Sequence, residues 1–118
     1  MEDHIVLRKS HAFALRIVQL RVYLHKKHSF LLKDQVFRSG ISIGAIAEEF
    51  GRLDATKDSL EIITSSYREA LGTHFWLRLL RDTGYIDDRM AHSLLADCEE
   101  LLKIIGSIQK TVKGKTRH

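Results

Sequence analysis

The chain has 118 residues, of which 44% are hydrophobic and 29% are charged, and its formal net charge is +4. This length is typical of one domain with one core, and the balance of apolar and charged residues excludes disordered and fibrous proteins. No apolar run approaches the ~20 residues of a membrane-spanning helix, and the first residues lack the features of a signal peptide, so we expect a cytoplasmic protein.

The first expected helix covers residues 6–27, where apolar residues recur at spacings of three and four. Its basic end, residues 25–28, places positive charge beside the unpaired carbonyls of the last helical turn. Ser29 then offers an N-cap for a second helix. The apolar stripe of the first helix consists of Ala12, Phe13, Ile17, Leu20 and Leu24.

The second expected helix covers residues 30–53 and keeps a heptad spacing throughout. It contains Gly40 and Gly44, each of which costs a helix about 1 kcal/mol relative to alanine. We therefore predict that a neighbouring backbone approaches both glycines closely. The stripe of this helix consists of Leu32, Val36, Ser39, Ile43, Ile46, Phe50 and Leu53.

The third expected helix covers residues 57–82, and its apolar stripe is unusually wide. Such a helix is expected to have more than one set of neighbours, in its own bundle or in another subunit. His74 lies on the stripe and is predicted to be a core or interface histidine. The central stripe consists of Leu60, Ile63, Tyr67, Ala70, His74 and Leu77, and it is widened by Ile62, Leu71, Phe75 and Leu79.

The fourth expected helix covers residues 88–112 and is preceded by a stop signal at Gly84, which can adopt a left-handed conformation. Asp87 or Asp88 can cap its start. Cys98 lies on its apolar stripe and has no second cysteine to pair with, which predicts a buried structural thiol. Residues 113–118 are expected to form a flexible basic tail.

Short connections make successive helices antiparallel, and the absence of proline favours long helices. The sequence therefore predicts an all-α, up-down-up-down four-helix bundle that forms a single domain over residues 1–118.

Positive charge is concentrated at the two ends of the sequence. Residues 1–38 contain eight Lys or Arg against three Asp or Glu, and residues 103–118 contain five against none. An up-down bundle brings the end of the fourth helix to the level of the start of the first, while further cations follow one face of the first helix. We predict phosphate contacts there, although solvated helix faces that bind nothing explain the same charges. The predicted contacts are Arg8, Lys9, Arg16, Lys26, Lys27, Lys110, Lys113, Lys115 and Arg117.

Sequence motifs of catalysis are lacking, so we expect neither an enzyme nor a cofactor. His25 and His28 are one helical turn apart, but two ligands make a weak metal site, and no metal is expected. A carboxylate near Arg38 inside the bundle is interpreted as an orienting salt bridge. This predicted structural polar cluster consists of Arg38, Ser42, Glu49 and Glu69.

Several longer segments are characteristic of one family. The chain resembles the four-helix-bundle proteins encoded in intervening sequences of bacterial large-subunit ribosomal RNA genes, which are often labelled ribosomal proteins. The segments are Lys9–Ile17 (KSHAFALRI), Gln35–Ala45 (QVFRSGISIGA), Arg68–Ala70 (REA), Thr73–Leu80 (THFWLRLL) and Asp82–Asp87 (DTGYID).

The resemblance implies a homopentamer of antiparallel bundles with a role in binding nucleic acid. A similar bundle is the accessory variability protein of diversity-generating retroelements, where a basic pentamer works with a reverse transcriptase and RNA. This chain departs from the family by having Ile46 where asparagine is common and Gly72 where glutamate is common, and both departures remove polar groups.

Two functions follow as hypotheses. The first is a non-catalytic, oligomeric nucleic-acid-binding protein, associated with RNA, that holds phosphates through the basic first helix and C-terminal residues. The second is a protein-interaction scaffold or structural oligomer without a nucleic-acid role. Exposure of Phe75, Trp76 or Tyr85 favours the scaffold, although these aromatic residues are equally suited to burial between subunits.

Overall fold

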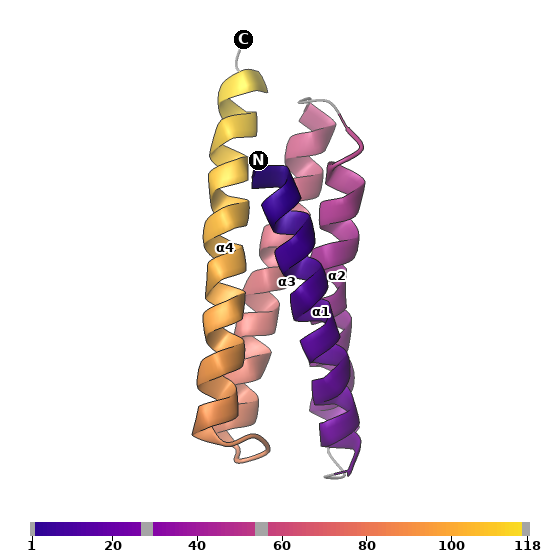
Figure 1. Ribbon diagram of the computed structural model, residues 1–118, viewed down its shortest axis with the longest axis vertical. Coiled ribbons are helices and arrows are strands. Elements are labelled where there is room, and N and C mark those ends of the chain that lie inside the picture. The colour runs from indigo at the N-terminus through magenta and orange to yellow at the C-terminus, as the bar shows by residue number, and fades with distance from the viewer. Residues whose placement is uncertain (1, 27–29, 54–56, 117–118) are drawn as a thin grey trace.

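Four long helices run up and down along one axis in the computed structural model (Figure 1). The molecule measures 51 × 20 × 19 Å, and each helix is antiparallel to the next, as predicted. The structure describes residues 2–26, 30–53 and 57–116. The helices are α1 (Glu2–Lys26), α2 (Phe30–Phe50), α3 (Lys57–Asp82) and α4 (Asp88–Thr116).

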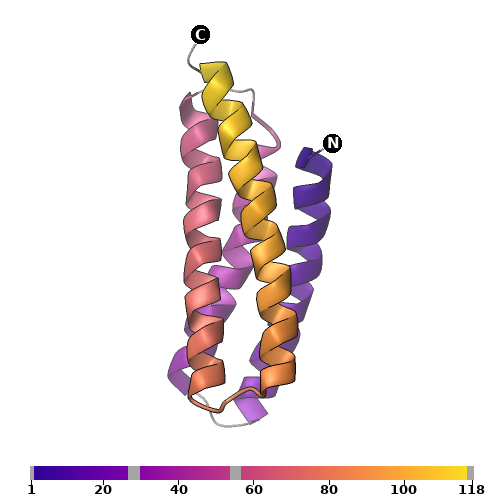
Figure 2. The same cartoon turned by 90° about the vertical axis from the view of Figure 1, so that its left-hand side faces the viewer.

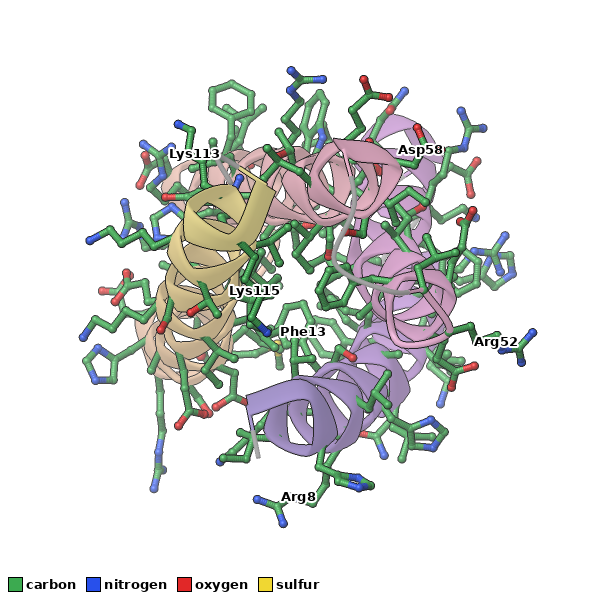
Figure 3. The ribbon with its side chains drawn as sticks, turned by 90° about the horizontal axis from the view of Figure 1, so that it is seen from above. Arg8, Phe13, Arg52, Asp58, Lys113 and Lys115 are labelled. Atoms are coloured by element: carbon green, nitrogen blue, oxygen red, sulfur yellow. The ribbon has the colours of Figure 1, made fainter. Side chains whose placement is uncertain are left out.

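Seen along the axis, the helices occupy the corners of a square in chain order (Figure 3). Among the described residues, α2 packs against both α1 and α3, and α4 packs against α3 and, less extensively, against α1. Helices α1 and α3 therefore lie diagonally across the bundle, and their outward faces point to opposite sides of the molecule.

The predicted stripes line the bundle axis. Phe13, Ile43, Leu77 and Ile105 are all fully or almost fully buried, one from each helix. Two stripe assignments are wrong: Ala12 is exposed because it lies one residue, or about 100° of helical rotation, away from Phe13, and Leu53 is 43% exposed. Over their described residues, none of the helices carries an apolar stretch that could span a bilayer.

Close packing of α2 against α1 explains Gly40. A Cβ atom at Gly40 would lie 2.7 Å from Cγ1 of Ile17, well inside van der Waals contact. The close neighbour there is thus a side chain and not the predicted backbone. Backbone is near Gly44, where a Cβ atom would lie 3.5 Å from the carbonyl oxygen of Ser10, but this is an ordinary contact distance that leaves room for alanine.

Small hydroxyl groups join α2 to α3 within the core. The hydroxyl groups of Thr73 and Ser39 are hydrogen-bonded to each other, with 2.9 Å between Oγ1 and Oγ, and Ser66 donates from Oγ to the carbonyl oxygen of Ile43 at 3.1 Å. Each buried hydroxyl thus has a partner, which removes most of its desolvation cost. This hydrogen-bonded seam was not predicted from the sequence.

Cys98 is buried, as predicted, and its thiol donates to the carbonyl oxygen of Ala70 on α3 at 3.3 Å. Burial raises the pKa of this thiol to about 12, and the nearby carboxylates of Glu99 and Asp97 contribute to the rise. The thiol therefore stays protonated at neutral pH and serves as packing.

The turn between α3 and α4 follows its sequence signals. Gly84 has a φ of +82°, the left-handed conformation that ends helices, and the amide of Tyr85 donates to the carbonyl oxygen of Leu80 at 2.9 Å. Asp87 caps α4, because its Oδ1 accepts a hydrogen bond from the amide of Met90 at 2.7 Å.

The helix boundaries differ from the prediction at both chain ends. Helix α1 already begins at Glu2 rather than at residue 6. Helix α4 continues to Thr116, so residues 113–116 are helical rather than a tail. Buried Val112 anchors these last turns, and Lys113 complements their free carbonyls. Helix α2 ends at Phe50, before a turn of i→i+3 hydrogen bonds.

Candidate nucleic-acid interface

The start of α1 and the end of α4 lie at the same end of the bundle, and α4 projects beyond α1 (Figures 1 and 2). Most of the cations predicted to contact phosphates are carried by these two segments. Arg8, Lys110 and Lys115 are exposed and form no ion pair with another described residue. Arg117 lies outside the described residues.

These cations do not form one patch, because their side chains point in different directions (Figure 3). Arg8 points outward from α1, and Lys115 lies on the side of α4 that faces α1. Lys113 lies on the opposite side of α4, next to α3. A ligand that contacts all three must therefore wrap around the end of α4.

The predicted basic face of helix 1 faces α4 and is already paired with carboxylates. Lys9 Nζ lies 3.3 Å from Glu100 Oε1, and Arg16 Nη1 lies 2.7 Å from Asp97 Oδ2. Both pairs are partly exposed and thus individually weak, but a phosphate would have to compete with them. Lys26 is exposed at the far end of α1, and Lys27 lies outside the described residues.

The predicted polar cluster is not joined by ion pairs among the described residues. Ser42 donates from Oγ to the backbone carbonyl of Arg38 at 2.8 Å, and the backbone carbonyl of Glu69 accepts from Thr73 Oγ1 at 2.8 Å. The side chains of Arg38 and Glu49 are exposed. Only Ser42 and Arg38 are thus brought together, and only through the backbone.

His74 bridges α3 and α4, as expected of an interface histidine. Its Nε2 donates to Glu99 Oε2 at 2.9 Å, and its Nδ1 accepts from Arg78 Nε at 3.0 Å, so one neutral tautomer satisfies both bonds. The hydrogen bond from His74 lowers the pKa of the Glu99 carboxyl, and the charge of Lys103 lowers it further.

This lowered pKa predicts a small, pH-dependent stabilisation. Because the folded-state pKa of Glu99 lies below its unfolded value, its contribution is present above about pH 4.3 and is lost as pH falls through the folded-state pKa. We expect Glu99→Gln to lower the free energy of unfolding at neutral pH by at most about 1 kcal/mol, since the pair is exposed. In denaturant titrations, the difference from the native chain should shrink as pH falls through the folded-state pKa of Glu99 and vanish in more acidic solution.

Glu61→Gln is the matched control, because the Glu61 side chain forms no ion pair with a described residue. This variant should match the native chain at every pH. A Glu99→Gln difference that persists in acid would show that the effect does not come from the ionised carboxylate.

The histidine pair considered for metal binding is only half described. His25 Nδ1 accepts a hydrogen bond of 2.8 Å from Nζ of the buried Lys33. His28 lies outside the described residues. Over the described residues, there is no group of three or more side chains with metal-binding atoms close enough to share an ion.

Two apolar surfaces lie on opposite sides of the bundle. We call them the α1 stripe, comprising Leu15, Val18 and Val22, and the α3 patch, comprising Leu71 and Phe75. The α1 stripe residues are 55%, 44% and 53% exposed, and the α3 patch residues are 51% and 48% exposed. Contiguous exposed apolar residues on a helix are typical of contact surfaces.

Phe75 is part of a small aromatic group. Its ring lies edge-on to Trp76 at 5.3 Å between centroids, and the Arg78 guanidinium lies 5.8 Å from the centroid of Phe75. Trp76 is half-buried against the core, whereas Tyr85 is 40% exposed.

Comparison with known proteins agrees with the fold and with the resemblance. The family model described as 23S rRNA-intervening sequence protein matches residues 2–107. A crystal structure from Bacteroides thetaiotaomicron, described as a protein with unknown function from the S23 ribosomal protein family, matches with a TM-score of 0.90 and 36% identity. The match covers 93% of this chain and 99% of that one. Among curated proteins, no match was found. The chain therefore belongs to the 23S rRNA-intervening sequence protein family.

Proposed function

We propose that this protein is a non-catalytic, oligomeric, RNA-associated protein that holds phosphates mainly through the last turns of α4. One observation carries the proposal: α4 projects beyond α1 and, from residue 103 to the end of the chain, the sequence contains five basic and no acidic residues (Figures 1 and 2). A protruding basic helix end is accessible to a polyanion without rearrangement of the bundle.

Because two cations of α1 are already paired with carboxylates, we place the proposed phosphate contacts mainly on α4. Lys9 and Arg16 share their charge with Glu100 and Asp97, so they contribute less to phosphate binding than the sequence suggested. Arg8, Lys26 and Lys27 remain part of the proposed contact surface, as does Arg117.

The α1 stripe and the α3 patch support self-association. Two different surfaces on opposite sides of one molecule favour a head-to-tail contact, in which α1 of one subunit packs on α3 of the next. Repetition of such a contact closes a ring when the rotations between subunits add up to a full turn, and it forms an open filament otherwise. We propose the ring. The number five comes from the family resemblance, which implies a homopentamer. Several copies of a modest cationic surface on one assembly would bind a long RNA far more tightly than one copy.

A catalytic role finds little support in the described side chains. The thiol of Cys98 is buried, with a pKa raised to about 12, and His74 has both ring nitrogens engaged. Neither group is available as a nucleophile or a general base.

The exposed aromatic residues favour the alternative function, a protein-interaction scaffold. Phe75 and Tyr85 are 48% and 40% exposed, and both lie towards the turn between α3 and α4, away from the basic end. A pull-down that recovers one specific protein after nuclease treatment would support this alternative.

Salt titration of RNA binding tests the phosphate proposal. Replacing Lys110, Lys113, Lys115 and Arg117 by alanine should weaken binding at low salt. It should also reduce the slope of log K against log[salt] by up to roughly 0.7 for each phosphate that the variant no longer neutralises. Fluorescence anisotropy with a mixed RNA pool measures both quantities.

A charge-matched control removes four exposed cations elsewhere. These are Arg38, Arg52, Arg68 and Arg89. The control should keep most of the native slope. Native binding that does not change with salt, or an α4 variant that binds like the native chain, would contradict the proposal.

A further inference from the structure

A groove of about 500 Å³ runs between α3 and α4 near the basic end of the bundle. This volume falls within the range of protein sites for small ligands. Its lining residues are Leu60, Thr64 and Tyr67 from α3, and Gly106, Gln109, Lys110 and Lys113 from α4.

The floor of the groove is aromatic. Tyr67 packs against the core yet is only half-buried, so part of its ring faces the groove. A Cβ atom at Gly106 would lie 4.0 Å from Cε1 of Tyr67, an ordinary contact distance. Packing thus does not require glycine at this position, and glycine weakens the helix. What the glycine does is leave the Tyr67 ring uncovered.

Polar groups on the groove wall are suited to the edge of a base. Gln109 Nε2 donates to Thr64 Oγ1 at 3.1 Å, which orients the amide and the hydroxyl next to each other. An amide and a hydroxyl together provide hydrogen-bond donors and acceptors, as base edges require.

The charge of this groove selects an anion. Lys110 and Lys113 lie at its rim, and none of the described residues that line it is acidic. The groove between the same helices at the other end of the bundle contains Asp88 and Glu99, and the groove between α1 and α2 contains Glu48. Of these grooves, the one beside Tyr67 combines a half-buried aromatic ring with two lysines and has no carboxylate among its described lining residues.

We infer that this groove binds an unpaired nucleotide, with the base against Tyr67 and the phosphate beside Lys110 and Lys113. The inference rests on the proposed function and adds that single-stranded RNA is preferred over duplex. Bases within a duplex are stacked and paired, so they cannot enter a groove, whereas unpaired bases stack readily on aromatic side chains.

The test compares single-stranded RNA with a duplex of the same length by fluorescence anisotropy. Gly106→Leu should fill the groove and lower the affinity for the single strand roughly five- to tenfold, the effect expected when one base can no longer stack. Its affinity for the duplex should stay as in the native chain. Ala96→Leu is the matched control, since Ala96 is exposed on the same helix and lines the groove at the other end of the bundle, so this variant should leave both affinities unchanged.

Photo-crosslinking of the native chain gives an independent readout that does not depend on a folded variant. RNA that contains 4-thiouridine should crosslink to the α3 peptide that includes Tyr67. Equal affinity for both RNAs, or crosslinks only elsewhere, would overturn the groove site and leave the phosphate proposal standing. A native protein that binds no RNA at all would overturn both.

Discussion

Replacing Gly40 by alanine is expected to lower the free energy of unfolding by up to about 2 kcal/mol, although alanine is the better helix former. The new Cβ atom would lie 2.7 Å from Cγ1 of Ile17, which is fully buried and cannot move into solvent. Overpacking of this kind costs about 1–3 kcal/mol, and the gain in helix propensity offsets only about 1 kcal/mol of it. Chemical denaturation at constant protein concentration measures the difference.

Gly106→Ala is the matched control. It makes the same substitution in the middle of a helix, but the new Cβ atom meets its nearest neighbour at 4.0 Å. This variant should therefore gain up to about 1 kcal/mol from helix propensity alone.

A double-mutant cycle isolates the contact between α1 and α2. Ile17→Ala alone should cost about 2–5 kcal/mol, because it leaves a cavity in the core. In the double variant with Gly40→Ala, the new methyl group has room in the cavity. The double variant should therefore be destabilised by less than the sum of the two single effects. The expected coupling energy is about 0.5–3 kcal/mol. Strict additivity, or a stabilising Gly40→Ala, would show that the two helices do not approach each other this closely.

Val22→Glu is expected to dissociate the proposed oligomer into monomers. Val22 is 53% exposed in the single chain, and burying a carboxylate in an apolar contact costs several kcal/mol in each interface. The monomer itself should be unaffected, because Glu at position 22 lies four residues before Lys26, a favourable helical pairing. Light scattering during size-exclusion chromatography measures the mass.

Thr111→Glu is the control for added charge. It places a carboxylate four residues before Lys115 on an exposed part of α4, away from both apolar surfaces. Its oligomeric mass should equal that of the native protein. If Val22→Glu also keeps the native mass, the α1 stripe is not an interface.

Mixing two dissociated variants distinguishes a head-to-tail contact from a symmetric dimer. Phe75→Glu should also give monomers, because it disrupts the α3 patch. A head-to-tail contact predicts that Val22→Glu and Phe75→Glu chains pair one to one, since each pair retains one intact interface. The mixture should then have the mass of two 13.6 kDa chains. A mixture that stays monomeric would contradict this arrangement.

Most of the fold could be predicted from periodicity, because core positions repeat every three or four residues wherever one face of a helix is buried. Gly84 and Asp87 also conform to local rules, since a left-handed turn and an N-cap depend on a few adjacent residues. The end of α4 was less predictable, because its last turn, with Lys113 and Lys115, lies beyond Val112, the last residue of the apolar stripe.

The candidate site was only partly predictable. Charge counts identified Lys110, Lys113 and Lys115. The direction of each side chain, however, depends on how α4 packs against α1 and α3, which a charge count does not contain. The pairing of Arg16 with Asp97 joins residues 81 positions apart, which no local pattern reveals. The half-buried Tyr67 ring likewise depends on Gly106 from another helix, and a glycine beside the regular α4 stripe was the one available signal.

The most direct test of an oligomeric, phosphate-holding protein is light scattering on nuclease-treated protein, chromatographed with RNA over a series of salt concentrations. We expect a mass several times that of the 13.6 kDa chain at every salt concentration, with RNA co-eluting at low salt and released at high salt. An oligomer that never retains RNA, or RNA binding that is insensitive to salt, would contradict the proposed function.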